Sequence, residues 1–224
     1  MSQEQWSAVD RYIAERLVPS DPALEATLAA SEAAGLPAIS VAANQGKLLQ
    51  LLAQAIGART ILEIGTLGGY STIWLARALA SGGRLITLEA NPVFAEVARA
   101  NIARAGLADR VELRLGPALE TLPQIAAEGL GPFDLVFVDA DKENNSDYFR
   151  WALNLSRAGS LIVVDNVVRE GAVIDAGRQD AHIQGVRDFY AAAGAEPRVS
   201  MTALQTVGAK GYDGFAIGLV TAEP

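Results

Sequence analysis

The spacing of apolar positions changes near residue 60 and divides the chain into two parts. Before that point apolar residues recur three or four positions apart, which predicts helices. The clearest such series is Trp6, Val9, Ile13 and Leu17. Two more helices are predicted over residues 23–34 and 48–56, each followed by a glycine. These helices, within residues 1–57, could cover an active site or form a subunit contact, and the sequence leaves both roles open.

From residue 60 onward, short apolar runs alternate with stretches of helical spacing. The apolar runs predict five strands, at residues 60–65, 84–89, 111–115, 133–139 and 160–165. The intervening stretches predict four helices, at residues 71–80, 92–105, 119–127 and 144–155. Residues 161–164 are all apolar, as expected for a parallel strand that helices cover on both faces. The pattern therefore predicts an α/β fold with a mostly parallel sheet.

The last part of the chain predicts a hairpin in place of a further parallel strand. After a helix come two strands, and the three elements lie at residues 180–193, 199–207 and 214–220. The stretch between the strands, residues 208–213, is rich in turn residues. No repeat or linker interrupts the chain, so we expect a single domain over residues 1–224 with a catalytic core at 60–220.

Composition narrows the class of protein. The 224 residues are 50% hydrophobic and 20% charged, as in an ordinary globular enzyme. The net charge of -8 argues against a nucleic-acid surface, because phosphate binding needs clustered Lys and Arg. The lack of cysteine excludes thiolate nucleophiles and zinc–thiolate sites. We see no signal-peptide pattern and no apolar run of the roughly 20 residues that a membrane helix needs, so a cytoplasmic protein is expected.

Glycines, carboxylates and amides follow the predicted strands at the points where they end. In open α/β sheets, ligands bind beyond the carboxyl ends of the strands. Five such segments occur here, at residues 65–71, at Glu89, at residues 116–118, at residues 139–142 and at residues 165–166. Their convergence on one edge of the sheet predicts the ligand site.

The glycine loop after the first strand differs from a dinucleotide-binding loop. In G-x-G-x-x-G the second and third glycines let the backbone approach a pyrophosphate. Counted from Gly65, those positions hold Leu67 and Tyr70, so the pattern fails. Gly65, Gly68 and Gly69 can still turn tightly beside a ligand without phosphates, although a plain strand-to-helix turn has the same composition.

Two glutamates are candidate ligand contacts. Glu89 lies 24 positions after Gly65, about where such folds place a carboxylate that accepts ribose hydroxyls, although surface carboxylates at strand ends are common. Glu63 lies inside an apolar strand, and a buried carboxylate is costly unless it is paired. Its partner is expected to be the amino group of a ligand, with Arg59 as the alternative.

Asp139, Asp165 and Asn166 predict a metal site. These oxygen donors end two strands, which suits an octahedral Mg²⁺ site that keeps room for substrate oxygens. Lys142, three residues after Asp139, is near enough to reach a hydroxyl bound to the metal. The alternative is that the two aspartates cap helices or pair with Lys142, and the full set of donors favours the metal.

Other polar and aromatic residues carry weaker expectations. His182, the only histidine, is expected on a helix surface. Tyr148 and Trp151 recur at helical spacing and are expected to pack in the core. Arg169 and Glu170 follow the expected metal ligands and are candidates for the substrate border.

Together these motifs resemble the caffeoyl-CoA and catechol O-methyltransferase family of class I S-adenosylmethionine-dependent enzymes. The resemblance rests on residues 61–71, 116–118, 137–142 and 165–166, keeps their order, and runs from about Ala38 to Val220. Because residues 139–142 read Asp-Ala-Asp-Lys, the chain resembles the bacterial and plant caffeoyl-CoA-like branch more closely than the animal catechol enzyme. The resemblance implies a Rossmann-like methyltransferase fold with seven strands, the last forming an antiparallel hairpin, extra N-terminal helices, and a homodimer.

The resemblance also implies roles for individual residues. The S-adenosylmethionine site would comprise Val41, Glu63, Gly65, Thr66, Ser71, Glu89, Ala118, Asp139 and Asp141. Within it, Glu89 would hold the ribose and Ala118 would lie against the adenine. Asp139, Asp165 and Asn166 would bind a divalent metal, Mg²⁺ or else Mn²⁺ or Ca²⁺, and Lys142 would act as general base.

The acceptor is the open part of this resemblance. Glu170 stands where plant relatives carry a substrate-binding Asn, and residues 36–43 do not match their substrate lid. The resemblance implies a catechol-type acceptor and leaves open whether it is a hydroxycinnamoyl thioester, a flavonoid, a simple catechol or a catechol unit in a secondary metabolite. The reaction expected is in-line transfer of a methyl group from sulfonium to oxygen, with Lys142 taking the hydroxyl proton.

Two other functions are compatible with a sheet of this kind. An NAD-dependent dehydrogenase is disfavoured by the failed glycine pattern and by the lack of any Tyr-x-x-x-Lys pair. A non-catalytic regulator that binds an adenosyl ligand is disfavoured because Lys142 and the whole set of metal donors are present.

Overall fold

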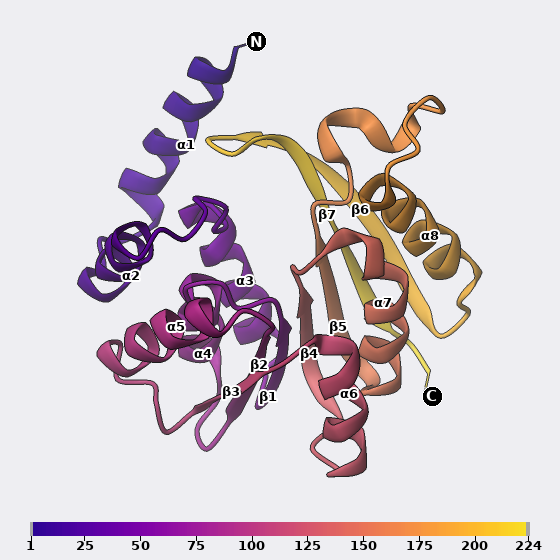
Figure 1. Cartoon of the computed structure of the whole chain (residues 1–224), viewed down its shortest axis with the longest axis horizontal. Helices are drawn as coiled ribbons and strands as arrows, with labels where there is room; N and C mark the ends of the chain where they lie inside the picture. The colour runs from indigo at the N-terminus through magenta and orange to yellow at the C-terminus, as the bar shows by residue number, and fades with distance from the viewer. Residues whose placement is uncertain (1, 223–224) are drawn as a thin grey trace.

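The computed structural model describes residues 2–222, so residue 1 and residues 223–224 of the expected domain lie outside the description. A seven-stranded sheet runs through the centre of the molecule (Figure 1). Its strands are β1 (Thr60–Ile64), β2 (Arg84–Glu89), β3 (Val111–Leu115), β4 (Phe133–Val138), β5 (Ser156–Asp165), β6 (Val199–Gly208) and β7 (Gly211–Val220). The order across the sheet is β3-β2-β1-β4-β5-β7-β6, and only the pairings that involve β7 are antiparallel.

Helices cover both faces of this sheet. One layer comprises α2 (Pro22–Ala33), α3 (Ala43–Ala55), α4 (Tyr70–Ala78) and α5 (Pro92–Arg104), whose apolar side chains form one buried cluster with the sheet. The other layer comprises α6 (Ala118–Ala127), α7 (Asn145–Asn154) and α8 (Ala181–Ala195). The expected Rossmann-like α/β fold, with its antiparallel hairpin and extra N-terminal helices, is confirmed.

The central strand β4 shows why these sequences form a covered parallel sheet. All six of its residues are buried. Successive side chains of a strand point to opposite faces. Leu135 and Phe137 accordingly pack with α3 and α4, whereas Val136 and Val138 pack with α7 and α8. A strand that is buried on both faces along its whole length is typical of a parallel sheet between two helical layers.

The first two helices begin at side-chain caps. Asp21 accepts hydrogen bonds from the first backbone N–H groups of α2, and Pro22 occupies the first helical position. The first helix, α1 (Gln3–Leu17), contains no buried residue and lies beside the tip of the β6–β7 hairpin (Figure 1). There Asp10 accepts a hydrogen bond from the backbone N–H of Ala209 at 2.7 Å.

The hairpin and β5 differ from the sequence expectation. The hairpin loop contains only Ala209 and Lys210, because Gly208 pairs with Gly211, and Gly211 has a φ of +94°. A two-residue loop with glycine at its end lets the strands twist together, so Tyr212 and Asp213 belong to β7. β5 begins at Ser156, before the predicted start at residue 160. Its first residues alternate between buried and more exposed positions, so they form no continuous apolar run.

Two short 3-10 helices complete the described chain. η1 (Lys142–Asn144) follows β4, and η2 (Arg169–Ile174) follows β5. Both lie just beyond the carboxyl ends of central strands, where the sequence analysis expects chemistry. Over residues 2–222, no helix combines the length and the apolar character needed to cross a membrane.

Candidate active site

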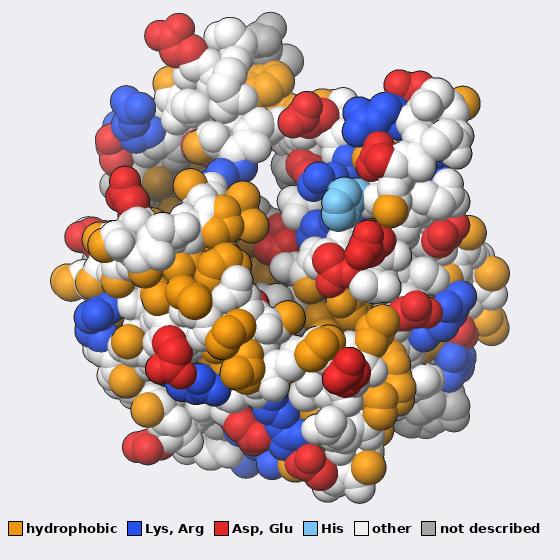
Figure 2. All heavy atoms as spheres, viewed as in Figure 1, with side chains coloured by type: hydrophobic (Ala, Val, Ile, Leu, Met, Phe, Trp, Pro, Cys, Tyr) orange, Lys and Arg blue, Asp and Glu red, His pale blue; other side chains and the backbone are white. Residues whose placement is uncertain are grey.

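A cavity of about 870 Å³ opens at the carboxyl ends of the parallel strands. Figure 2 shows the surface hollowed between the two halves of the molecule, with acidic side chains visible inside the hollow. The strand-end segments expected to converge all line this cavity. Of the predicted site residues, those that line it are Val41, Gly65, Thr66, Ser71, Glu89, Ala118, Asp139, Asp141, Lys142, Asp165, Asn166, Arg169 and Glu170. Only Glu63 lies behind the wall.

The glycine loop sits against the strand beside it. Gly65 has a φ of +99°, and a side chain there would come within 2.2 Å of the Asp139 carbonyl oxygen, so only glycine fits. Leu67 has a φ of +49°, and its backbone N–H donates to Oε2 of Glu89 at 2.8 Å. Oε1 of Glu89 accepts from the backbone N–H of Asn91 at 2.9 Å. The carboxylate of Glu89 is thus fixed at the cavity edge by backbone donors.

Glu63 is fully buried beneath this loop. Its carboxylate accepts hydrogen bonds from the hydroxyls of Ser71 at 2.7 Å and Thr87 at 2.7 Å, and from Thr72. Burial outweighs these hydrogen bonds and raises the pKa of Glu63 to about 7. The alternative partner Arg59 is wrong, because within residues 2–222 the Glu63 carboxylate bonds to these three hydroxyls and forms no ion pair with Arg59. Since Ser71 lines the cavity and bonds to Glu63, the Ser71 side chain lies between Glu63 and the cavity.

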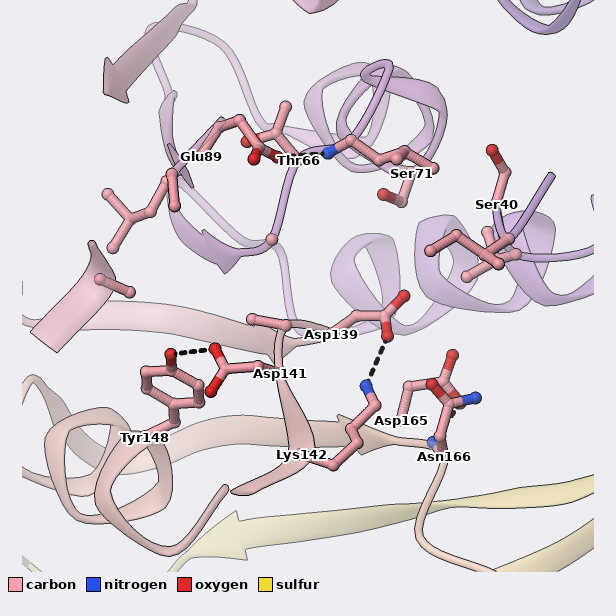
Figure 3. A pocket seen from close by; sticks show the side chains of 18 of the residues that line it. Ser40, Thr66, Ser71, Glu89, Asp139, Asp141, Lys142, Tyr148, Asp165 and Asn166 are labelled. Carbon is pink, nitrogen blue, oxygen red and sulfur yellow. Dashed lines mark hydrogen bonds and ion pairs between the residues drawn. The ribbon is translucent and has the colours of Figure 1, made fainter. Parts of the chain in front are cut away.

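Lys142, Asp139, Asp165 and Asn166 form one group on a single side of the cavity (Figure 3). Lys142 Nζ donates to Oδ1 of Asp139 at 2.8 Å. Lys142 is buried, and α8 packs against η1, the short helix that begins with Lys142. Part of the alternative interpretation, a pairing of Lys142 with Asp139, is therefore present in this structure.

Among the described residues 2–222, Asp165 has no cationic partner at hydrogen-bonding distance. Its carboxylate accepts from the side-chain amide of Gln45 at 2.7 Å and from the backbone N–H of Asn166 at 2.8 Å. Burial first, and then the charge of Asp139, raise the pKa of Asp165 to about 7. Two neighbouring carboxylates form a site where a bound cation would relieve the repulsion between their charges.

The donor set fits a hard divalent cation. Two carboxylates and one amide supply only oxygen ligands, which is the chemistry that Mg²⁺, Mn²⁺ and Ca²⁺ prefer. Within the described residues 2–222, no three His, Cys, Asp or Glu side chains cluster for metal binding. Any such site therefore depends on the amide of Asn166 as the third donor.

Several lining residues were not predicted to be functional. Tyr148, expected to pack in the core, is buried but donates its hydroxyl to Oδ1 of Asp141 at 2.6 Å at the cavity wall. Burial and Asp141 both raise the pKa of Tyr148. Its helical spacing is the same as that of a core residue, so the sequence carries no signal for the contact. His182 is exposed, as expected, but its helix surface faces the cavity.

Residues from distant parts of the chain complete the cavity wall. Gln45 reaches Asp165 from α3, and Lys210 reaches the cavity from the hairpin loop. Lys210 Nζ donates to the carbonyl oxygen of Ala38 at 2.9 Å, and burial lowers its pKa. Lys210 therefore connects the hairpin loop to the segment before α3, beside the cavity.

Comparisons with known proteins agree with this geometry. A family model described as O-methyltransferase matches residues 19–214. A catechol O-methyltransferase from Niastella koreensis is 53% identical over 220 residues, covering 98% of this chain and 100% of that protein. A catechol O-methyltransferase from Mycobacterium tuberculosis is 58% identical over 212 residues, covering 95% of this chain and 94% of the relative.

Solved structures give the same result. An O-methyltransferase from Bacillus cereus in complex with SAH superposes with a TM-score of 0.97 at 60% identity, covering 98% of this chain and 100% of that one. An O-methyltransferase from Streptomyces achromogenes, involved in tomaymycin synthesis and solved in complex with SAM, has a TM-score of 0.96 at 52% identity, covering 99% and 100%. With its sequence matched almost from end to end, this chain belongs to the O-methyltransferase family.

Proposed function

We propose that this chain transfers the methyl group of S-adenosylmethionine to one hydroxyl of a catechol-type acceptor, assisted by a divalent cation. The observation that carries the proposal is the grouping of Asp139, Asp165 and Asn166 in the same cavity as the glycine loop and Glu89. Relatives solved with SAM or SAH support the methyl donor, and relatives named catechol O-methyltransferase support the acceptor.

The donor would occupy the half of the cavity between the glycine loop and α6. Glu89, already held by two backbone N–H groups, would accept the ribose hydroxyls, and Ala118 would lie against the adenine. Ser71 lines the wall and bonds to Glu63 behind it, so a ligand ammonium near Ser71 would favour the charged form of Glu63. Leu67 and Tyr70 stand where a dinucleotide-binding loop has glycine, which favours an adenosyl sulfonium over a pyrophosphate.

The acceptor would occupy the side with Asp139, Asp165 and Asn166, which would hold the cation. When bound, a divalent cation supplies positive charge that favours the ionised form of a catechol hydroxyl. With the cation and the sulfonium bound, Lys142 would act as the neutral amine, and its Nζ, which lies 2.8 Å from Oδ1 of Asp139, would take the hydroxyl proton. The oxygen then forms a bond to the methyl carbon while the carbon–sulfur bond breaks, and its electron pair stays on sulfur.

The structure around Lys142 and Asp165 suits a step in which opposite charges cancel. Lys142 is 8% exposed and Asp165 is 5% exposed. A site with so little access for water strengthens electrostatic interactions, and fixed reactants avoid much of the entropic cost of alignment. The positions of Lys142 and Asp165 therefore favour a catalyst over a non-catalytic ligand-binding protein.

Turnover with isomeric diols tests this proposal. Purified protein is incubated with methyl-labelled S-adenosylmethionine and either catechol or resorcinol, with Mg²⁺ or with a chelator, and products are measured by mass spectrometry. We expect methylation of catechol with Mg²⁺, little with resorcinol, and recovery when Mg²⁺ is restored after chelation. Equal methylation of both diols, or catechol turnover that the chelator leaves unchanged, would contradict the proposal. Tight NADH binding measured by fluorescence would instead favour the dehydrogenase.

A further inference from the structure

The segment that follows β5 has an unusual backbone. Asn166, Arg169 and Glu170 have φ values of +58°, +56° and +56°. Residues with side chains seldom adopt this left-handed region, and they remain there only where surrounding contacts hold them. The same three residues line the cavity, and Asn166 is one of the three oxygen donors of the proposed cation site. A specific contact is therefore needed to hold this segment.

Asp213, in β7, makes that contact. Its Oδ1 accepts hydrogen bonds from the backbone N–H groups of Val168 at 3.0 Å and Arg169 at 2.8 Å, and from Gly214 at 2.9 Å. Its other oxygen lies 3.6 Å from the guanidinium of Arg169. One carboxylate thus bonds two consecutive backbone donors between Asn166 and Glu170.

The backbone next to Asp213 holds the carboxylate in this position. Val167 N–H donates to the carbonyl oxygen of Gly214 at 3.0 Å, directly after the pairing of Asp165 with Phe215. A Cβ atom at Gly214 would come within 2.3 Å of the Leu204 carbonyl oxygen and 2.6 Å of Val168 Cγ2. Position 214, directly after Asp213, therefore packs too closely against Leu204 and Val168 for any residue except glycine.

We infer that Asp213 is a positioning residue, which acts through the segment after β5 to hold Asn166 toward the cation and Arg169 and Glu170 toward the acceptor. The inference rests on the proposed function for the roles of those three residues. Asp213 itself is not required to touch the cation. A carboxylate that only stabilised the hairpin would affect folding without a selective effect on one half of the cavity.

Three variants and one matched control test this inference. Asp213→Ala removes the acceptor oxygens, Asp213→Asn keeps one oxygen acceptor, and Asp213→Glu displaces the carboxylate by one methylene. The control is Asp175→Ala, because Asp175 follows η2 and accepts from the backbone N–H of Gly177 at 2.9 Å outside the cavity. The measurements are hydrogen exchange of the amides of residues 166–171, the Kd of Mn²⁺, the Kd of S-adenosylhomocysteine and the KM of catechol.

For Asp213→Ala we expect exchange in residues 166–171 and the Kd of Mn²⁺ each to increase roughly tenfold. The KM of catechol should rise as well, while the Kd of S-adenosylhomocysteine stays within about twofold of the wild type, because the donor half is unaffected. Asp213→Asn should stay within about threefold of the wild type for Mn²⁺, since its oxygen can still accept. The Asp175→Ala control should leave all four quantities unchanged.

Three results would overturn the inference. One is an unchanged Kd of Mn²⁺ and unchanged exchange in Asp213→Ala, or in Asp213→Glu if the alanine variant does not fold. Another is equal weakening of Mn²⁺ and S-adenosylhomocysteine binding. The third is a loss in Asp213→Asn as large as in Asp213→Ala. If the wild type neither binds Mn²⁺ nor methylates catechol, the proposed function fails, and amide exchange still tests the contact between Asp213 and the segment after β5.

Discussion

Nζ of Lys142 lies 2.8 Å from Oδ1 of Asp139, so the proposed general base bonds directly to a proposed metal ligand. Both side chains come from the segment between β4 and α7. Helix α8 packs against the backbone of that segment from outside, and a Cβ atom at Gly185 would approach the Lys142 carbonyl oxygen to 2.2 Å. The position of Lys142 therefore depends on a glycine more than forty residues later in the chain.

Replacing Lys142 by Met should remove the proton acceptor and keep most of the side-chain volume. We expect kcat for catechol to fall by about 10² to 10⁴, the usual contribution of general acid–base catalysis. The Kd of S-adenosylhomocysteine, measured by calorimetry, should change little, because Lys142 lies on the acceptor side. A variant with wild-type kcat would exclude Lys142 as the base.

Gly185→Ala should impair catalysis by displacing Lys142. The added methyl group would also come within 2.6 Å of the Glu143 Cα atom, so η1 must move. Such overpacking destabilises a protein by about 1–3 kcal/mol. We expect a lower kcat and a lower free energy of unfolding in urea.

Gly194→Ala provides the matched control in the same helix. No atom lies within 4 Å of a Cβ placed at Gly194, and the residue is exposed. Alanine in a helix is favoured over glycine by roughly 0.5–1 kcal/mol, so this variant should be slightly more stable and fully active. Equal kcat values for the two variants would show that α8 does not position Lys142.

Glu63 should make the stability of the ligand-free protein depend on pH. Burial raises its pKa to about 7 from an ordinary value of 4.5. The folded state therefore binds more protons than the unfolded state between these values, and the stability that Glu63 contributes is lost as pH rises through this window. The corresponding free energy is about 3 kcal/mol at most.

Glu63→Gln removes this titration. The variant should gain stability relative to the wild type as pH rises from about 4.5 to 7, and the difference should be constant at higher pH. Urea unfolding of both proteins at a series of pH values, without S-adenosylmethionine, measures the effect. A constant difference across the whole window would mean that Glu63 keeps an ordinary pKa in the folded protein.

Tyr148→Phe should weaken binding of S-adenosylmethionine by loosening Asp141. The hydroxyl of Tyr148 donates to Asp141 at 2.6 Å, and both residues line the cavity. If binding of S-adenosylmethionine depends on Asp141, loss of this one hydrogen bond to a charged group should weaken the binding free energy by about 1.5–3 kcal/mol. Tyr190→Phe is the control, because Tyr190 lines a different cavity. Identical Kd values of S-adenosylmethionine for the wild type and Tyr148→Phe would show that Asp141 does not contribute to its binding.

The strand-end residues could be predicted from sequence because topology alone brings them together. Parallel strands place their carboxyl ends at one edge, so Glu89, Asp139 and Asp165 had to meet once the strands were recognised. The partners of Glu63 were harder to predict. Its hydroxyl donors lie on α4 and β2, and their hydrogen bonds depend on how closely those elements pack.

The remaining residues of the cavity depend on tertiary packing. Gln45 reaches Asp165 from α3, 120 positions earlier in the chain, and Lys210 reaches the segment before α3 across 172 positions. The sequence predicts Asp213 in a turn because residues 208–213 are rich in turn residues, yet the short hairpin loop places it in β7. No local pattern encodes these contacts, because each depends on where a distant element packs.

Mn²⁺ binding measured by electron paramagnetic resonance tests the central claim most directly. Wild-type protein saturated with S-adenosylhomocysteine is titrated with Mn²⁺, in parallel with Asp165→Asn and with Asp175→Ala as the control. We predict one bound Mn²⁺ per chain in the wild type and the control, and a Kd weakened by roughly tenfold or more in Asp165→Asn. No binding in the wild type, or equal affinity in all three proteins, would contradict a metal site at Asp139, Asp165 and Asn166.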